Sequence, residues 1–221
     1  MNVFVTGTDT GCGKTYVTAG LLRHLAARGT RALGMKPIAS GAERIDGQLV
    51  NEDVRALVAA SSVAVPPRVL NPYLFEPPAS PHLAAAASGA HVDLDVIRDA
   101  YAACRAAAEV VVVEGVGGWQ VPLAEDLDVA DLVRALGLPV LLVVGVRLGC
   151  INHALLTSAA IAEAGIVCHG WVANVLEPDL YDRDGVIETM ARRIPAPLLA
   201  TIEAGDTSSL ATLAAGLAAP D

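Results

Sequence analysis

Residues 7–15 read GTDTGCGKT, and this stretch constrains the fold more than any other part of the chain. The common phosphate-binding loop has the pattern G-x-x-x-x-G-K-[ST] between a strand and a helix. In this chain, Thr8 occupies the position of the first glycine of the pattern. The preceding glycine, Gly7, is separated from Gly13 by five residues rather than four. An apolar run precedes the loop, and an alanine- and leucine-rich stretch follows it. This context favours a nucleotide-binding loop over a glycine-rich turn before a helix, and it predicts an α/β fold.

The loop contains several groups that suit phosphate binding. Gly11 and Gly13 allow backbone amides to point inward, and the N-terminus of the following helix adds partial positive charge. Lys14 is predicted to reach the phosphates, and the Thr15 hydroxyl to bind Mg²⁺. Cys12 lies at the same helix start, where the pKa of a thiol can fall. We expect Cys12 to fill space and to have no catalytic role.

Short β-branched runs alternate with alanine-rich stretches, which is typical of a doubly wound α/β fold with a mostly parallel sheet. The expected strands are 2–6, 31–35, 110–114, 140–146, 167–174 and 198–202. The expected helices are 14–27, 52–60, 94–107, 129–136, 152–163, 184–193 and 208–217. Residues 66–81 contain six prolines, which argue against a central helix or strand there. This segment is either a surface connector or a shaped loop beside the ligand site.

Composition and charge exclude several classes of protein. The chain has 221 residues, 53% of them hydrophobic, which predicts one packed domain over residues 1–221. A net charge of −9 and a pI of about 4.9 disfavour nucleic-acid binding and a polybasic membrane anchor. The four cysteines form no CxxC pair, so neither a zinc site nor a disulfide framework is expected. The start, MNVFVTGTD, lacks the basic region of a signal peptide, and we expect a cytoplasmic protein.

In open parallel sheets, ligands bind beyond the carboxyl ends of the strands, so the residues after each strand are candidates. Lys36, in MKPIASG, is either a lysine of the ligand crevice or an ordinary surface lysine. Asp53 lies in the first turn of a helix, where the helix dipole favours an acid with or without a metal. Glu114 ends an apolar run, like the acid of a Walker B strand, and can hold Mg²⁺. Gly115 and Gly117 let the backbone approach a ligand closely.

Two later loops also carry candidates. Residues 149–152 form a small-residue start to a helix, and their free amides suit an anion such as a carboxylate. Arg147 either helps to hold an anion or is an ordinary surface arginine. His153 is expected to be structural, because no acid or nucleophile is spaced to partner it. Asn174 either reads the edge of a purine base or is a turn residue at a strand end.

The complete set of motifs resembles that of the dethiobiotin synthetases. The set comprises GTDTxxGKT, MKPIASG, VVEGVGGW, VVGVRLGCINHALLT, GWVANV and IPAPLL, with NPY at 71–73 and SPH at 80–82. The match runs from about residue 2 to residue 202, and the combination is specific where any one motif is weak. The resemblance implies a P-loop NTPase-like fold with about seven strands and a homodimer with active sites at the subunit interface. It also implies that the proline-rich segment borders the active site.

The resemblance further implies an ATP-dependent ligase of biotin biosynthesis. Such an enzyme converts 7,8-diaminononanoate, CO₂ and ATP, with Mg²⁺, into dethiobiotin, ADP and phosphate. One substrate amine captures CO₂ as a carbamate, whose oxygen attacks the γ-phosphate. The second amine then closes the ureido ring and expels phosphate. Phosphoryl transfer of this kind depends on positioning and charge neutralisation, which suits a site with two lysines, a metal and many amides.

Positions that match the family's motifs receive their roles from the resemblance. The catalytic lysines are Lys14 and Lys36, which neutralise phosphate and carbamate charge. The metal is held by Thr15, Asp53 and Glu114. The nucleotide is bound by Gly11, Cys12, Gly13, Lys14, Thr15, Tyr16, Asp53, Glu114, Gly115, Val116, Gly117, Asn174, Val175, Glu203, Ala204 and Gly205. The substrate is bound by Thr10, Ser40 and, from the other subunit, Gly149, Cys150, Ile151 and Asn152.

The chain departs from the family pattern at two places, and two rival functions remain to be weighed. Gly11 stands where a glutamate is expected, and residues 203–205 lack the expected proline and aromatic residues around the base.

The main rival function is that of a partitioning or division-site ATPase, which has the same fold. Such ATPases carry an extra lysine where this chain has Asp9, and many end in a basic amphipathic helix. Residues 208–221 contain no lysine or arginine. An amidotransferase-type synthetase would need a glutamine-hydrolysing domain, for which 221 residues leave little room.

Overall fold

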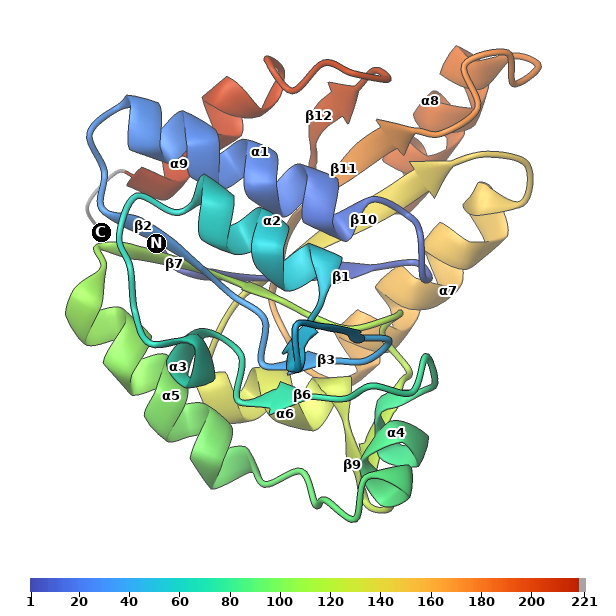
Figure 1. The fold of residues 1–221 in the computed structure, drawn as a ribbon. Helices are drawn as coiled ribbons and strands as arrows, with labels where there is room; N and C mark the ends of the chain where they lie inside the picture. The colour runs from blue at the N-terminus through green and yellow to red at the C-terminus, as the bar shows by residue number, and fades with distance from the viewer. Residues whose placement is uncertain (219–221) are drawn as a thin grey trace.

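A computed structural model describes residues 1–218, and its centre is a sheet of six parallel strands (Figure 1). The strands are β1 (Val3–Gly7), β2 (Ala32–Met35), β7 (Val110–Glu114), β10 (Val140–Val146), β11 (Cys168–Val175) and β12 (Leu198–Ile202). Their order across the sheet is β12-β11-β10-β1-β7-β2. β1, β7 and β10 are buried along their whole length. Helices therefore cover both faces, which is the usual setting of a parallel sheet.

The helices form two layers (Figure 1). One face of the sheet carries α1 (Lys14–Ala27), α2 (Glu52–Ala60) and α9 (Leu210–Ala218). The other face carries α5 (Leu94–Ala107), α6 (Val129–Leu136), α7 (Cys150–Glu163) and α8 (Arg183–Arg193). Each face has its own buried hydrophobic cluster, and the sheet separates the two. This arrangement confirms the doubly wound α/β fold expected from the sequence.

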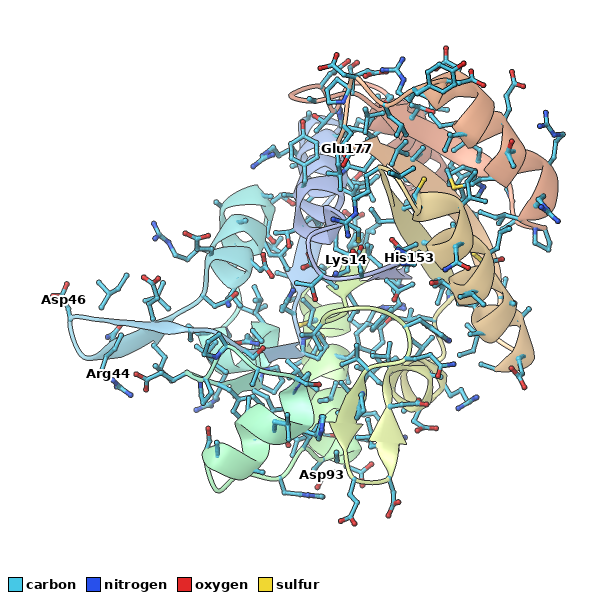
Figure 2. All side chains as sticks on the ribbon, turned by 90° about the vertical axis from the view of Figure 1, so that its right-hand side faces the viewer. Lys14, Arg44, Asp46, Asp93, His153 and Glu177 are labelled. Atoms are coloured by element: carbon cyan, nitrogen blue, oxygen red, sulfur yellow. The ribbon has the colours of Figure 1, made fainter. Side chains whose placement is uncertain are left out.

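Shorter elements connect the main ones. The helices are α3 (Pro67–Leu70) and α4 (Pro81–Ala87), and the strands are β3 (Ile38–Ala39), β4 (Glu43–Ile45), β5 (Gln48–Val50), β6 (Tyr73–Leu74), β8 (Pro122–Ala124) and β9 (Leu127–Asp128). These strands pair β3 with β6, β4 with β5 and β8 with β9, so none of them extends the central sheet. Over residues 1–218 that sheet thus has six strands rather than about seven. Figure 2 shows the β4–β5 hairpin, with Arg44 and Asp46, projecting from the body of the molecule.

Most expected helices have the bounds that the sequence pattern indicates, and the differences lie at their ends. α7 begins at Cys150 rather than at Asn152, and α8 at Arg183 rather than at residue 184. The residue before each helix adopts the left-handed conformation, with φ of 93° at Gly149 and 45° at Asp182. The last helix begins at Leu210 rather than at residue 208. Among residues 1–218, no helix combines the length and the apolar content that a membrane span requires.

The proline-rich residues 66–81 contribute nothing to the central sheet, as expected. They contain α3 and β6, and Pro81 is the first residue of α4, where its missing N–H leaves no helical hydrogen bond unmade. The backbone of this segment bonds to the segment after β2: Gly41 N–H donates to Pro77 O at 3.0 Å and Ala42 N–H to Phe75 O at 3.0 Å. Residues 66–81 are therefore held against the chain that carries Lys36.

The strand order places the candidate loops at one point. β1 lies between β10 and β7, and the chain proceeds from β1 to one edge of the sheet before it returns to the other side. The carboxyl ends of β1, β7 and β2 are adjacent. They lead to Lys14 at the start of α1, to Gly115 and to Lys36, respectively. Ligands of such sheets bind where the strand order reverses in this way.

Candidate active site

The loop between β1 and α1, residues 8–13, is the predicted phosphate loop. Gly13 has a φ of 96°, and a Cβ at this position would lie 2.0 Å from Asn174 Nδ2. Glycine therefore fits here both in conformation and in space. The side chain of Cys12 is fully buried, and a Cβ at Gly7 would lie 2.2 Å from its Sγ atom. Cys12 fills space behind the loop, as expected from the sequence.

Lys14 is tied to the loop that it terminates. Its Nζ donates to the carbonyl oxygen of Asp9 at 3.0 Å, and its side chain is mostly buried. An ammonium has three N–H donors, and within residues 1–218 the Lys14 ammonium makes this one hydrogen bond, so two donors remain for phosphate oxygens. The carboxylate of Asp9 forms an ion pair with Arg147, which follows β10. Arg147 is thus a partner of the phosphate loop rather than an unattached surface arginine.

Thr15, Lys36, Asp53 and Glu114 meet beside the phosphate loop, and we call them the acid–lysine cluster. Lys36 Nζ lies 2.8 Å from Asp53 Oδ2 and 2.5 Å from Glu114 Oε1. Thr15 Oγ1 lies 2.8 Å from Asp53 Oδ1 and 2.7 Å from Glu114 Oε1. Lys36 and Glu114 are buried, whereas 45% of the Asp53 side chain is exposed. The structure therefore brings all four predicted residues together, and the Lys36 ammonium forms ion pairs with both acids.

The charges of the cluster stabilise one another. Burial alone would lower the pKa of the Lys36 ammonium, but Glu114 and Asp53 outweigh burial and raise that pKa above its usual value. Burial would raise the pKa of Asp53, but Lys36 and the Thr15 hydrogen bond hold it below its usual value. The ion pair thus persists at neutral pH. It is lost on acidification through the lowered pKa of Asp53 or on alkalinisation through the raised pKa of Lys36.

Two features of the cluster fit a divalent cation such as Mg²⁺. The Thr15 hydroxyl has one hydrogen but faces two carboxylate oxygens, so one of these contacts brings two oxygens together without a hydrogen between them. Glu114 Oε2 is buried and has no hydrogen-bond partner. Over residues 1–218, no group of three or more His, Cys, Asp or Glu side chains forms a metal site. Two carboxylates and a hydroxyl match Mg²⁺, which takes few protein ligands and completes its shell with water and substrate phosphates.

A cavity of about 700 Å³ opens next to the cluster. Its wall contains Lys14, Thr15, Lys36 and Asp53, together with Thr10, Gly11, Gly13, Ala39, Ser40, Gly41, Asn51, Pro78, Ala79, Ser80, Pro81, Val116, Gly117 and Val121. The proline-rich segment thus borders the cavity, as the resemblance implied. The cavity wall includes charged side chains as well as apolar side chains of proline, alanine and valine.

Two asparagines at this site were not singled out from the sequence. Asn51 caps α2 by accepting from Val54 N–H at 3.2 Å, and its Nδ2 donates to Ser40 O at 3.2 Å. Asn71 is buried, and its Nδ2 donates to Lys36 O at 2.6 Å and to Tyr73 O at 3.0 Å. Both side chains fix the backbone of predicted site residues. The N-cap position of Asn51 was a usable signal, since asparagine is favoured there.

Within residues 1–218, several predicted residues do not line the cavity: Cys12, Tyr16, Glu114 and Gly115 near the phosphate loop, and, farther along the chain, Gly149, Cys150, Ile151, Asn152, Asn174, Val175, Glu203, Ala204 and Gly205. Gly149 precedes α7 without a side-chain cap, and Cys150 N–H donates to Arg147 O at 3.0 Å, so the amides of Ile151 and Asn152 remain for a ligand. Glu203 is exposed and pairs with Arg183 at 3.1 Å. Asn174 is buried, and its Nδ2 donates to Cys12 O at 2.9 Å. Asn174 is thus a residue of β11 held against the phosphate loop rather than a turn residue after the strand.

Asn174→Ala is expected to weaken the binding of inorganic tripolyphosphate. The substitution removes the donor to Cys12 O, so the free loop can rearrange to pair this carbonyl with water. Phosphate binding must then restore the loop at a cost of roughly 1–3 kcal/mol, and we expect about a tenfold loss of affinity. Isothermal titration calorimetry with tripolyphosphate, which has no adenine, measures the affinity of the loop for phosphates alone. An unchanged affinity for tripolyphosphate, combined with a loss for ATP, would show that Asn174 acts on the base alone.

Comparison with known proteins gives close relatives over nearly the whole chain. A family described as "AAA domain" matches residues 1–210. The ATP-dependent dethiobiotin synthetase BioD of Aromatoleum aromaticum is 50% identical over 217 residues, which are 98% of this chain and 96% of the relative. The protein of the same name from Xanthomonas oryzae pv. oryzae is 52% identical over 217 residues, which are 98% of this chain and 97% of the relative.

Solved structures with the same fold are much more distant in sequence. The MinD cell division protein of Aquifex aeolicus superposes with a TM-score of 0.55 at 14% identity, covering 96% of this chain and 85% of that one. A ParA family ATPase from Chlorobium tepidum superposes with a TM-score of 0.57 at 12% identity, covering 98% of this chain and 90% of that one. At this level of identity the likeness concerns the fold alone.

Proposed function

The chain belongs to the dethiobiotin synthetase family, and on that premise we propose how its site performs an ATP-dependent ring closure. The enzyme is a ligase that converts 7,8-diaminononanoate, CO₂ and ATP into dethiobiotin, ADP and phosphate. The observation that carries the proposal is the convergence of Lys14, Lys36 and Asp53 on one cavity beside a phosphate loop, with the buried carboxylate of Glu114 in contact with Lys36. The reaction needs cations to neutralise phosphate and carbamate, and the cavity supplies them.

The phosphate loop and Lys14 bind and orient the triphosphate. Amides of residues 11–15 point toward the phosphates at the start of α1, and Lys14 donates its remaining N–H groups to them. When bound, Mg²⁺ supplies further charge neutralisation at the phosphates, held by Thr15, Asp53 and Glu114. Lys36 balances the negative charge of the carbamate. The carbamate oxygen then attacks the γ-phosphorus and ADP departs, after which the second amine attacks the carbonyl carbon and phosphate departs.

The cavity wall fits a flexible diamine with an alkyl chain. Pro78, Ala79 and Val121 provide apolar surface, against which methylene groups can pack. Thr10 and Ser40 lie on the same wall and offer hydroxyls to the amines or to the carbamate. We propose that these two residues position the reacting end, close to Lys36.

Direct assay tests this function. Purified protein is given ATP, Mg²⁺, bicarbonate and 7,8-diaminononanoate, and ADP release is followed together with the mass of the organic product. ADP release that depends on the diamine, with formation of dethiobiotin, is the expected result. ATP hydrolysis that is independent of the diamine and yields no dethiobiotin would refute the proposal and favour a switch ATPase. The structural likeness to MinD and ParA does not favour that rival, because it concerns the fold alone.

We propose that the protein acts as a homodimer whose active sites contain residues of both subunits. Residues 149–152 lie outside the cavity wall, yet their motif matches the family's carboxylate-binding loop. Leu148 is 86% exposed and Leu156 is 63% exposed, so the start of α7 presents apolar surface to solvent in the single chain. A partner subunit would cover these leucines. The loop of residues 149–152 in that partner would then bind the substrate carboxylate, with the amides of Ile151 and Asn152 as donors.

A mixed dimer distinguishes shared sites from sites within one subunit. Lys14→Ala inactivates the phosphate loop, and Gly149→Val strains the residue at φ 93°. If each site joins Lys14 of one subunit to Gly149 of the other, mixing the two inactive variants restores one working site per mixed dimer. At equal mixing we expect about one quarter of the wild-type activity, since about half of the dimers are mixed. Absence of recovery, with subunit exchange confirmed by mass, would place each site within one chain.

The remaining assignments are proposals that rest on the family motifs. We propose that adenine lies near Tyr16, Asn174, Val175 and residues 203–205. The contact from Asn174 Nδ2 to Cys12 O leaves one N–H and Oδ1 of Asn174 for the base. We also propose that residues 1–221 form one domain and that the enzyme acts in the cytoplasm. The expected C-terminal helix is described to Ala218, and residues 219–221 lie outside the described part of the chain.

A further inference from the structure

The acid–lysine cluster contains its own cation. Lys36 Nζ contacts Glu114 Oε1 at 2.5 Å, Asp53 Oδ2 at 2.8 Å and Gly115 O at 3.3 Å. An ammonium has three N–H donors, so these three acceptors use its whole capacity. In this arrangement Lys36 has no donor left for a phosphate or a carbamate. Its position differs from the one that its proposed chemical role requires.

The carboxylates that hold Lys36 are also the proposed metal ligands. Glu114 Oε1 is contacted both by Lys36 at 2.5 Å and by Thr15 at 2.7 Å, and Asp53 is likewise contacted by both residues. A divalent ion bound by Thr15, Asp53 and Glu114 would lie directly beside the ammonium. Like charges repel strongly where burial reduces dielectric screening. The ammonium and a divalent ion therefore compete for the same pair of acids.

We propose that Lys36 is the resident cation of the metal site and keeps a divalent ion out until nucleotide is bound. Bound phosphates offer Lys36 new anionic partners, so its ammonium leaves Asp53 and Glu114 as the divalent ion arrives with the nucleotide. The same movement turns the N–H donors of Lys36 toward the cavity, where the carbamate forms. The proposal rests on the metal ligands assigned under the proposed function, but it does not depend on which reaction follows.

The backbone around Lys36 confines this movement to the side chain. Lys36 N–H donates to Leu70 O at 3.0 Å, and Lys36 O accepts from Asn71 Nδ2 at 2.6 Å. The main chain is thus held on both sides by the proline-rich segment. A lysine side chain has four flexible methylene groups and a compact charge. Lys36 can therefore exchange partners by rotation about its side-chain bonds while the strand end stays in place.

Mn²⁺ binding to the full chain, without nucleotide and without diamine, tests the competition. Electron paramagnetic resonance measures free Mn²⁺ for the wild type and for Lys36→Met, which keeps a similar length but removes the charge. We expect Lys36→Met to bind Mn²⁺ at least about tenfold more tightly than the wild type, since the competing charge is gone. The matched control is Lys14→Met, which removes a charge from the same cavity but whose Nζ contacts Asp9 O and not the acids. Equal affinity of wild type and Lys36→Met, or equal gains in both variants, would overturn the proposal.

A second measurement uses the wild type, so it remains decisive if Lys36→Met fails to fold. Crystals grown with ADP and Mn²⁺ locate the metal by anomalous scattering. The expected result is Mn²⁺ at Asp53 and Glu114, with Lys36 Nζ turned toward the phosphates. Mn²⁺ at these acids with Lys36 still in contact with both would overturn the proposal. Assay of the same preparation with the diamine separates the two ideas, because a protein that forms dethiobiotin but fails here loses only the resident-cation proposal.

Discussion

Glu114→Gln is expected to lower kcat by roughly two to three orders of magnitude, which is the scale for loss of a charge that orients groups in the transition state. Glu114 is fully buried, and its Oε1 atom lies 2.5 Å from Lys36 Nζ and 2.7 Å from Thr15 Oγ1. Glutamine keeps the shape of the side chain but removes its charge. Lys36 then retains only the half-exposed carboxylate of Asp53, and the proposed metal site loses one of its two acids.

The same substitution is expected to lower the free energy of unfolding. Breaking a buried ion pair from one side costs about 3–5 kcal/mol, because the other charge is left buried and poorly paired. The measurement is urea unfolding followed by circular dichroism, alongside kcat from diamine-dependent ADP release. The hydrogen-bonding capacity of glutamine places the expected loss at the lower end of that range, since its amide oxygen can still accept from Lys36.

Asp53→Asn is the matched control, because Asp53 contacts the same lysine and the same threonine. Its side chain is 45% exposed, so water screens its charge and the loss of unfolding free energy should be about 1 kcal/mol or less. Its loss of turnover should be comparable to that of Glu114→Gln, since both are proposed metal ligands. Equal destabilisation by the two substitutions would contradict the role assigned to burial, and near-normal turnover of either variant would contradict the metal assignment.

The sequence predicted the positions of the functional groups better than their partners. Lys36 and Glu114 became candidates because residues at the carboxyl ends of parallel strands meet at one edge, but the strand pattern left open whether Lys36 was an ordinary surface lysine. The contact between them joins residues 78 positions apart, and the contact from Lys36 to Asp53 joins residues 17 positions apart. No local pattern encodes a side-chain direction across such separations. The sequence could therefore indicate a lysine in the crevice but not that its ammonium is held by two acids.

The fold shows the same division between long elements and short ones. β7, β10, α5 and α6 have the expected bounds, because apolar periodicity over several residues defines them. The strands β3, β4, β5, β6, β8 and β9 have two or three residues each and are too short to show a hydrophobic period. They form only where the tertiary structure brings them together. Asn71 illustrates the consequence for the site. It was seen as part of a motif, but its hydrogen bond to Lys36 O depends on the path of the proline-rich segment and could not be derived from spacing.

Lys14→Ala is expected to lower kcat at saturating ATP by roughly two to three orders of magnitude. Lys14 stands at the start of α1 with its Nζ 3.0 Å from Asp9 O, at the edge of the 700 Å³ cavity. Negative charge shifts among the phosphate oxygens as the γ-phosphoryl group transfers, so an ammonium fixed there stabilises the transition state more than the bound ATP. The fall in kcat should therefore persist at saturating ATP, and calorimetry measures separately the rise in the dissociation constant of ATP. Arg23→Ala, an exposed change on the same helix, should leave both constants within about twofold of the wild type, as is usual for surface substitutions. Loss of ATP affinity with near-normal kcat at saturation would show instead that Lys14 binds ATP and its transition state equally.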